Sequence, residues 1–183
     1  MKKFALLISL TTLIFQSQAQ VFIAKKCQID FFSAAPLEDI KAINKYTTPL
    51  LNTLTGAIVF KVKISSFEFE SALMQEHFNE NYMESEKFPY SLFDGKIIGD
   101  IDYKKDGTYQ VTANGKLTLH GVTKEVTVPG VITVKGNEIM INAKTPLTIK
   151  EYDIKVPSLY VKNIAETVDV TIDATLIPYI KKD

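Results

Sequence analysis

Apolar and polar residues alternate one for one along much of the chain, and this period of two constrains the fold more than any other feature. The alternation runs through residues 57–64, 110–120, 139–144 and 168–176. Successive side chains of a β-strand point to opposite faces, so each of these segments has one apolar and one polar face. Such strands are typical of an antiparallel sheet with a single buried side.

Turn residues separate the alternating segments. Asp106-Gly107, Gly121, Pro129-Gly130 and Gly136-Asn137 predict turns at the spacing that small barrels and sandwiches use. Long strands with free edges invite aggregation, and closure of the sheet removes those edges. We therefore predict an all-β fold, a closed antiparallel β-barrel of about eight strands.

Two segments have helical spacing instead, so the barrel is expected to carry one or two short helices. Residues 36–46 have apolar positions three apart and a proline where a first turn would lie. Residues 71–84 place Met74, Phe78 and Tyr82 four apart, which predicts a helix with one apolar stripe. A stripe of this kind favours a lid packed on the core over a ligand-binding motif.

The first twenty residues have the pattern of a secretory signal. Lys2 and Lys3 precede the apolar run Phe4–Phe15, and Ser17 and Ala19 supply small residues before a cleavage point. We predict a signal peptide over 1–19, cleaved after Ala19, and a mature domain over 20–183. The apolar run is shorter than the roughly 20 residues of a spanning helix, so the mature form is not expected to cross a membrane. A short N-terminal anchor or a buried strand is the alternative.

Charge argues against nucleic acid as a partner. The chain has 21 basic and 21 acidic residues, and every basic residue is lysine. Without Lys2 and Lys3, 19 lysines stand against 21 acidic residues, a net charge of −2. Arginine, whose planar fork binds phosphate and guanine, is absent, and the lysines form no basic block.

No arrangement of residues indicates catalysis, a metal or a cofactor. His77 and His120 lie far apart in sequence, and alternation puts His120 on a polar face, exposed to solvent. Asp100 and Asp102 are predicted to share one wet strand face, where carboxylates are usually only solvated. Metal-binding, phosphate-loop and nucleophile-elbow motifs are absent. Cys27, the single cysteine, is interpreted as a small core residue, with an intermolecular disulfide as the alternative.

Aromatic residues are concentrated in one part of the chain. The sequence contains 11 Phe and 8 Tyr but no Trp, and many of them lie between Phe60 and Phe93. Two interpretations remain open at this point. The rings fill the barrel core, or they line an apolar cavity, since a barrel of about eight strands has room for one small ligand.

Three segments resemble the YceI-like family. Residues Gly115–Val128, which contain Leu-Thr-Leu-His-Gly-Val-Thr-Lys, are similar to the family's signature strand pair. Residues His77–Pro89 resemble its helix and Lys-x-Pro turn, and Val168–Leu176 resembles its last strand. The resemblance spans most of the chain, roughly Val21 to Leu176.

The resemblance implies a lipocalin-like barrel in a periplasmic or secreted protein, with a polyisoprenoid or similar amphiphilic lipid inside. On this hypothesis the protein is a non-catalytic carrier, and a homodimer stays open. The competing hypotheses are an interaction barrel filled by its own side chains and, with no recognisable constellation, a hydrolase. The residues expected to line the apolar tunnel are Phe31, Phe60, Val62, Phe67, Phe78, Phe88, Leu117, Leu119 and Ile141.

Overall fold

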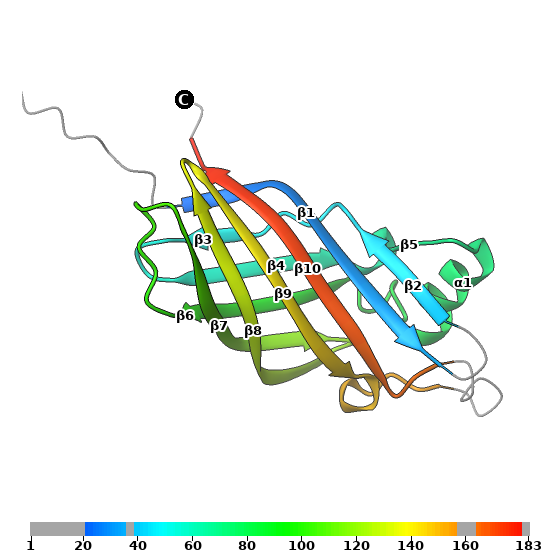
Figure 1. Cartoon of the computed structure of the whole chain (residues 1–183). Helices are drawn as coiled ribbons and strands as arrows, with labels where there is room; N and C mark the ends of the chain where they lie inside the picture. Colours follow the sequence, from blue (N-terminus) through cyan, green and yellow to red (C-terminus); the bar gives the residue numbers. More distant parts are fainter. Residues whose placement is uncertain (1–20, 36–38, 157–163, 181–183) are drawn as a thin grey trace, which may run out of the picture.

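Eight antiparallel strands close into a barrel in the computed structural model, which describes residues 21–35, 39–156 and 164–180. The sheet order is β10-β9-β8-β7-β6-β4-β3-β1, and β1 pairs with β10 to close it, as predicted (Figure 1). The eight strands are β1 Val21–Ala34, β3 Leu50–Asn52, β4 Ala57–Lys63, β6 Tyr90–Ile98, β7 Gly107–Leu119, β8 Val122–Lys135, β9 Glu138–Thr148 and β10 Thr167–Pro178.

Two small strands and four helical segments complete the described chain. The strands β2 (Asp39–Asn44) and β5 (Glu68–Phe69) extend the sheet from the second half of β1. The helical segments are η1 Ile64–Ser66, α1 Ala72–His77, the π-helical turn η2 Phe78–Tyr82 and η3 Ile149–Tyr152.

The predicted alternation is observed in the barrel wall. On β4, Ile58, Phe60 and Val62 are buried, while Lys61 and Lys63 are exposed. The apolar sets predicted for β7, β9 and β10 face inward in the same way. Interior and exterior residues therefore alternate along the long strands, as barrel closure requires.

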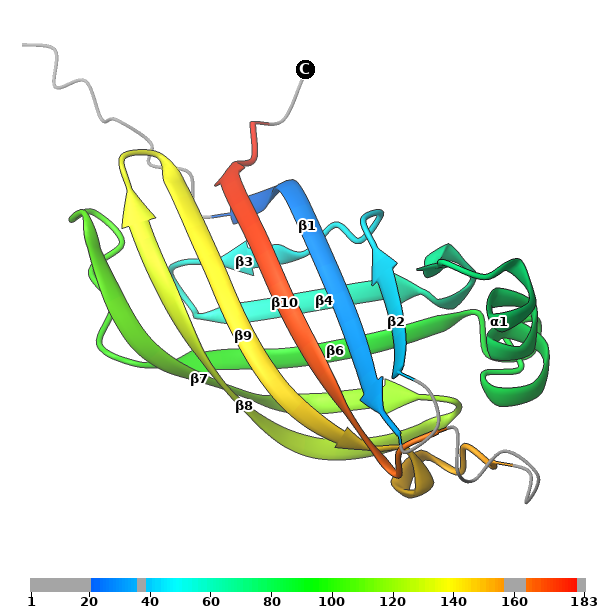
Figure 2. The same cartoon turned by 45° about the vertical axis from the view of Figure 1, so that its right-hand side comes forward.

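The two ends of the barrel differ. We call the end that holds the β3–β4, β6–β7 and β8–β9 turns the closed end, because Leu51, Ile139 and Leu176 are fully buried there. We call the other end, where α1 and η2 lie, the helical end (Figure 2). Any space inside the barrel is therefore limited at one end by packed side chains and at the other by the helical segments.

The β7–β8 hairpin contains two glycines that a side chain would disrupt. A Cβ on Gly115 would clash with the Asp94 carbonyl oxygen of β6, so the close approach of the two strands requires glycine. Gly121 has a φ of +79° in the turn, and a Cβ there would lie 2.6 Å from the Phe88 ring. The two glycines of the segment Gly115–Val128 are therefore required for steric reasons.

The prediction of a helix over residues 36–46 is wrong. Residues 39–44 form the strand β2, which pairs with β1 and β5, and 36–38 lie outside the described residues. Ile40, Ala42 and Asn44 face inward at a period of two. The spacing of Ile40 and Ile43 mimicked a helix, and pairing with the free second half of β1 overrides it.

The prediction of a turn at Pro129-Gly130 is also wrong. Both residues lie inside β8, where Pro129 is the register partner of Thr112 on β7. The pairing of β8 with β9 begins only at Gly130. Pro129 has no N–H to donate, and it stands where β8 has a single partner strand, which is where a sheet tolerates proline.

Cys27 lies on β1 opposite Ala174 of β10 and is 4 % exposed. Burial, with a smaller contribution from the Asp173 carboxylate, raises the pKa of the thiol to about 12. The thiol therefore stays protonated at neutral pH, and its position agrees with the interpretation as a core residue.

None of the helices in the described ranges has the length and apolar character needed to cross a bilayer.

Candidate functional site

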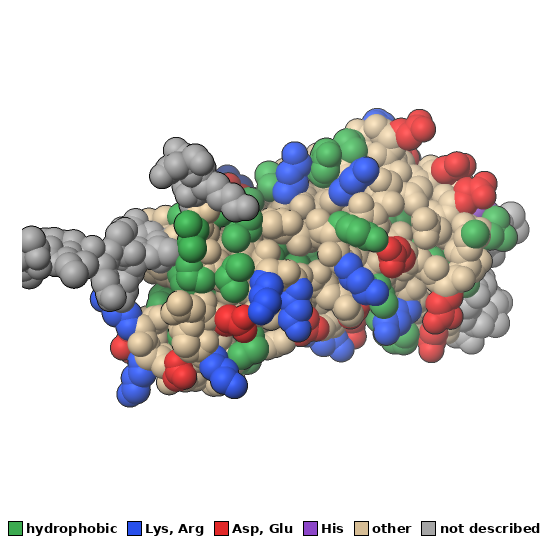
Figure 3. Space-filling model, turned by 90° about the horizontal axis from the view of Figure 1, so that it is seen from above, with side chains coloured by type: hydrophobic (Ala, Val, Ile, Leu, Met, Phe, Trp, Pro, Cys, Tyr) green, Lys and Arg blue, Asp and Glu red, His purple; other side chains and the backbone are tan. Residues whose placement is uncertain are grey.

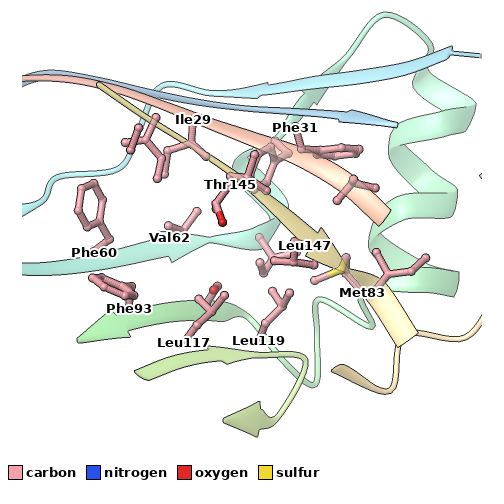
Figure 4. A pocket seen from close by; sticks show the side chains of 18 of the residues that line it. Ile29, Phe31, Phe60, Val62, Met83, Phe93, Leu117, Leu119, Thr145 and Leu147 are labelled. Carbon is pink, nitrogen blue, oxygen red and sulfur yellow. The ribbon is translucent and has the colours of Figure 1, made fainter. Parts of the chain in front are cut away.

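A cavity of about 530 Å³ lies inside the barrel. Side chains from β4, β6 and β7 point toward side chains from β1 and β9 across it, and the helical segment stands at one end (Figure 4). Its volume falls in the range of roughly 300–1,000 Å³ that small-molecule sites occupy.

The cavity is elongated along the barrel. On β7 alone the lining residues run from Val111 to Leu119, which corresponds to about 26 Å of strand at roughly 3.3 Å per residue. Lining residues begin near Ile58 and Ile97 toward the closed end and extend to Leu73 on α1. The shape therefore suits a long, narrow ligand better than a compact one.

The structure brings eight of the nine predicted tunnel residues together around this cavity. They are Phe31, Phe60, Val62, Phe67, Phe78, Leu117, Leu119 and Ile141. The side chains of these eight residues therefore border the cavity.

Phe88 does not lie among the cavity-lining residues. Its ring packs on the His120 ring, with centroids 4.5 Å apart, outside the strands and next to Gly121. Phe88 follows the helical segment in a loop, where no alternation determines the direction of a side chain. Its contact with His120 instead fixes the loop to the β7–β8 turn.

His120 is not the exposed residue that its strand position predicted. Its side chain is only 8 % exposed, and it joins three loops at the helical end. Nδ1 lies 3.1 Å from the Tyr152 carbonyl oxygen, and Nε2 lies 2.9 Å from Glu84 Oε2. Both partners are acceptors, so each ring nitrogen bonds only as a donor, and the imidazolium form satisfies both.

Backbone strain is concentrated around the same contacts. Glu84, His120 and Asp153 have φ values of +43°, +50° and +55°, and they are the non-glycine residues with positive φ in the described part of the chain. Such conformations persist only where the surroundings impose them. The His120 bonds thus hold the three loops in place beside Met83, Leu119 and the rest of the cavity lining.

We expect His120→Asn to lower the free energy of unfolding by about 1–3 kcal/mol. Asparagine tolerates the same backbone conformation, so the change removes the two bonds and the Phe88 contact without adding strain. Denaturant unfolding at neutral pH measures this, with Lys116→Asn on an exposed strand position as the control. A His120 variant as stable as the control would contradict the role given to these contacts.

Four phenylalanine rings attach the helical segment to the barrel. Phe78 of η2 stacks on Phe31 of β1 at 5.6 Å and contacts Phe67 and Phe69 at 5.7 and 4.9 Å between centroids. Ser71 caps the N-terminus of α1, and its Oγ accepts the Met74 N–H at 3.4 Å. The predicted 71–84 helix is confirmed, and its aromatic stripe forms part of the cavity wall.

The cavity lining carries almost no polarity. Among the described residues, no lysine, aspartate or glutamate lines it. The Ser33 hydroxyl oxygen accepts the Ala165 N–H at 2.9 Å, and the Ser91 hydroxyl donates to the Thr118 carbonyl at 3.0 Å. These buried hydroxyls are already bonded to backbone, so the cavity offers a ligand mainly apolar surface.

Several lining residues were missed by the sequence analysis. Val126 and Val128 of β8 and Thr145 and Leu147 of β9 line the cavity from two strand segments that are not paired with each other. Alternation around Val126 and Val128 was available as a signal, although Lys124 interrupts it. The inward position before Leu147 is the polar Thr145, so the apolar alternation that starts at Ile139 is interrupted before it reaches Leu147.

The prediction that Asp100 and Asp102 share a wet strand face is wrong. Asp100 and Asp102 lie in the exposed β6–β7 loop at the closed end instead of sharing a strand face. Asp102 Oδ1 accepts the Lys104 N–H at 2.9 Å, a local turn contact. Within residues 21–35, 39–156 and 164–180, His, Cys, Asp and Glu side chains form no group of three or more that could hold a metal ion.

Comparison with protein families gives one result that covers most of the chain. The model of the YceI-like domain matches residues 21–176. No curated protein matches the sequence.

Solved structures agree with the architecture at low sequence identity. A polyisoprenoid binding domain from Saccharophagus degradans, implicated in plant cell wall breakdown, is 13% identical with a TM-score of 0.71, covering 88% of this chain and 100% of its own. Burkholderia cenocepacia BcnA is 16% identical with a TM-score of 0.68, covering 81% of this chain and 95% of its own. A Campylobacter jejuni YCEI protein is 14% identical with a TM-score of 0.55 over the full length of both chains. At these identities the comparisons establish the fold alone.

Proposed function

The chain belongs to the YceI-like family, and from this premise we propose that it is a non-catalytic binding protein that holds a long apolar lipid inside its barrel. The observation that carries the proposal is the elongated cavity with a lining free of carboxylates and ammonium groups in the described residues. In an apolar cavity of this kind, a ligand gains binding free energy from each apolar carbon that moves out of water.

The magnitude of that gain is sufficient for tight binding. A buried methylene contributes about 0.8 kcal/mol, so ten of them contribute about 8 kcal/mol, on the order of micromolar affinity before the costs of association. A long lipid chain has more carbons than this. Even partial insertion therefore supplies the required free energy without any headgroup contact.

A polyisoprenoid is the lipid class that we propose. Two observations support it: the family of the chain, and the polyisoprenoid binding domain whose fold it shares. The wall adds aromatic and branched side chains, such as Phe60, Phe93 and Val62, that suit a chain with methyl branches. Straight-chain lipids of equal carbon number are the closest competitors.

We expect the affinity for prenols to rise by at least about tenfold for each added isoprene unit, since burial of only two methylene equivalents gives about 1.6 kcal/mol. Titration of delipidated protein with prenols of increasing length measures this, and linear alkanols of equal carbon number serve as controls. Affinity that does not depend on chain length would contradict burial of the chain, and equal affinity for both series would contradict the choice of a polyisoprenoid.

Two other functions have less support. An interaction barrel with a filled core would leave no internal space of about 530 Å³. For a hydrolase, a nucleophile needs an adjacent base, and the hydroxyls of Ser33 and Ser91 in the cavity bond to backbone groups instead. Binding without chemistry is therefore the function that the geometry supports best.

We also propose that the protein is exported, on the strength of the N-terminal pattern. Residues 1–20 lie outside the described residues, and β1 begins at Val21, one residue after the Gln20 start that cleavage after Ala19 predicts. N-terminal sequencing of protein from the periplasm or medium should begin at Gln20. A first residue of Met1 in a membrane fraction would contradict export of a mature soluble form.

A further inference from the structure

The headgroup of a bound lipid can lie at only one end of the barrel. Leu51, Ile139 and Leu176 are fully buried at the closed end, so an apolar chain meets packed side chains there. Toward the helical end the lining includes Leu73, which is 58 % exposed, and Met74 on α1. A chain inserted into the cavity therefore leaves its polar head at the helical end.

The helical end carries negative charge next to the cavity. Residues 68–86 contain six glutamates and neither lysine nor arginine. Glu76 and Glu80 are exposed on α1 and η2, within one turn of the lining residues Leu73 and His77. Acidic side chains gather at this end of the surface (Figure 3, right).

The described lysines at the helical end lie outside the cavity lining, including the exposed Lys150 and Lys155 beside the lining residues Ile149 and Ile154. Lys41 follows the lining residue Ile40 on β2, so its side chain points to the other, outward face of the strand. Lys87 lies 3.7 Å from Glu84 and over the Phe88 ring at 4.7 Å, outside the barrel. The cavity lining itself contributes no lysine among the described residues, and the chain has no arginine.

An anionic headgroup is therefore unfavourable in both places that it could occupy. Inside the cavity it would be a buried charge with no lysine or arginine in the described lining to pair with, which costs far more than the burial of a few methylenes gains. At the helical end it would meet the carboxylates of Glu76 and Glu80 on α1 and η2, and like charges repel over about one Debye length, roughly 8 Å at physiological salt. An uncharged hydroxyl or carbonyl head meets neither penalty.

We propose that the cavity selects apolar chains with an uncharged headgroup and discriminates against phosphate and carboxylate headgroups. This specificity rests on the proposed function and adds the chemical class of ligand to it. Its structural basis is the uncharged lining together with the acidic cap formed by α1, η2 and their flanking residues.

The test compares geranylgeraniol with geranylgeranyl phosphate, two ligands with the same chain and different heads. Each displaces a fluorescent apolar probe from delipidated protein at low salt and about pH 8, where imidazole groups are ordinarily neutral. We expect the alcohol to bind at least about tenfold more tightly than the phosphate. Phosphate binding as tight as that of the alcohol would overturn the proposed specificity but leave lipid binding intact, whereas displacement by neither ligand would contradict the proposed function itself.

Reversing the charge of the acidic cap tests whether the discrimination against phosphate arises at the helical end. Glu76→Lys/Glu80→Lys is expected to raise affinity for the phosphate about fivefold and to leave the alcohol unchanged. The control Asp100→Lys/Asp102→Lys makes the same change in net charge in the exposed β6–β7 loop at the closed end. An equal effect of both variants on the phosphate would mean that net charge, and not the cap, determines selectivity, and would overturn the assignment to the helical end.

Discussion

Leu117→Asp is expected to abolish retention of the lipid by a barrel that still folds. Leu117 lines the cavity from β7 and is half-buried, so its side chain borders the empty space and is not locked in the packed closed end. An aspartate there places a carboxylate against the apolar chain, and the described lining contains no lysine or arginine to pair with it. The cost of an unpaired buried charge exceeds the loss of several methylene contacts.

The design includes a second cavity variant and a nearby control. Phe60→Asp makes the same change on β4, and Lys61→Asp, one residue away, faces outward over the Tyr90 ring at 4.1 Å. Lipid retained after purification is quantified for each variant that has native circular dichroism. We expect loss in the two cavity variants and wild-type retention in Lys61→Asp.

A neutral blocking variant covers the case in which a buried carboxylate prevents folding. Ala113→Phe adds a ring to the cavity wall on β7 without adding charge, and it is expected to reduce lipid retention by occupying space. Folded cavity variants that retain as much lipid as wild type would contradict the assignment of the ligand to this cavity.

Leu176→Ala is expected to cost about 3–4 kcal/mol of unfolding free energy, and Leu117→Ala about half of that or less. The two substitutions remove the same atoms. Leu176 is fully buried at the closed end, so truncation opens a new void in packed surroundings. Leu117 already borders a cavity and has fewer contacts to lose.

Urea unfolding of delipidated protein measures both variants under the same conditions. Equal costs would mean that the barrel is packed around Leu117 as tightly as around Leu176. That result would favour an interaction barrel filled by its own side chains over the carrier.

The strands of the barrel were predictable wherever one face is buried and the other is wet. On β4 and β10 the period of two in the sequence is the period of the structure, so both the strand and its inward residues followed. The helix predicted over residues 36–46 was wrong because residues 39–44 form a strand through their pairing with β1, and the local spacing of apolar residues does not encode that pairing. The turn predicted at Pro129 was wrong because a proline can also lie within a strand where that strand has a single partner, and β8 pairs with β9 only from Gly130 onward.

The sequence predicts which side chains of the candidate site point inward, but it does not predict the volume of the cavity between them. Alternation determined that Phe60, Leu117 and Ile141 point inward, and they line the cavity. Inward side chains can fill the barrel or leave a cavity, and the outcome depends on how strands distant in sequence pack against one another. The local pattern of apolar and polar residues carries no information about that packing. For the same reason the burial of His120 could not be foreseen, since its partners Glu84 and Tyr152 lie 36 and 32 residues away.

The central claim is that this barrel holds a long apolar molecule, and a native mass spectrum of the protein purified from its own host tests it most directly. We expect a species heavier than the processed chain by the mass of one apolar molecule, which organic extraction removes. An extract whose components differ by whole isoprene units would identify a polyisoprenoid. A single species at the mass of the bare chain, unchanged by extraction, would contradict the account.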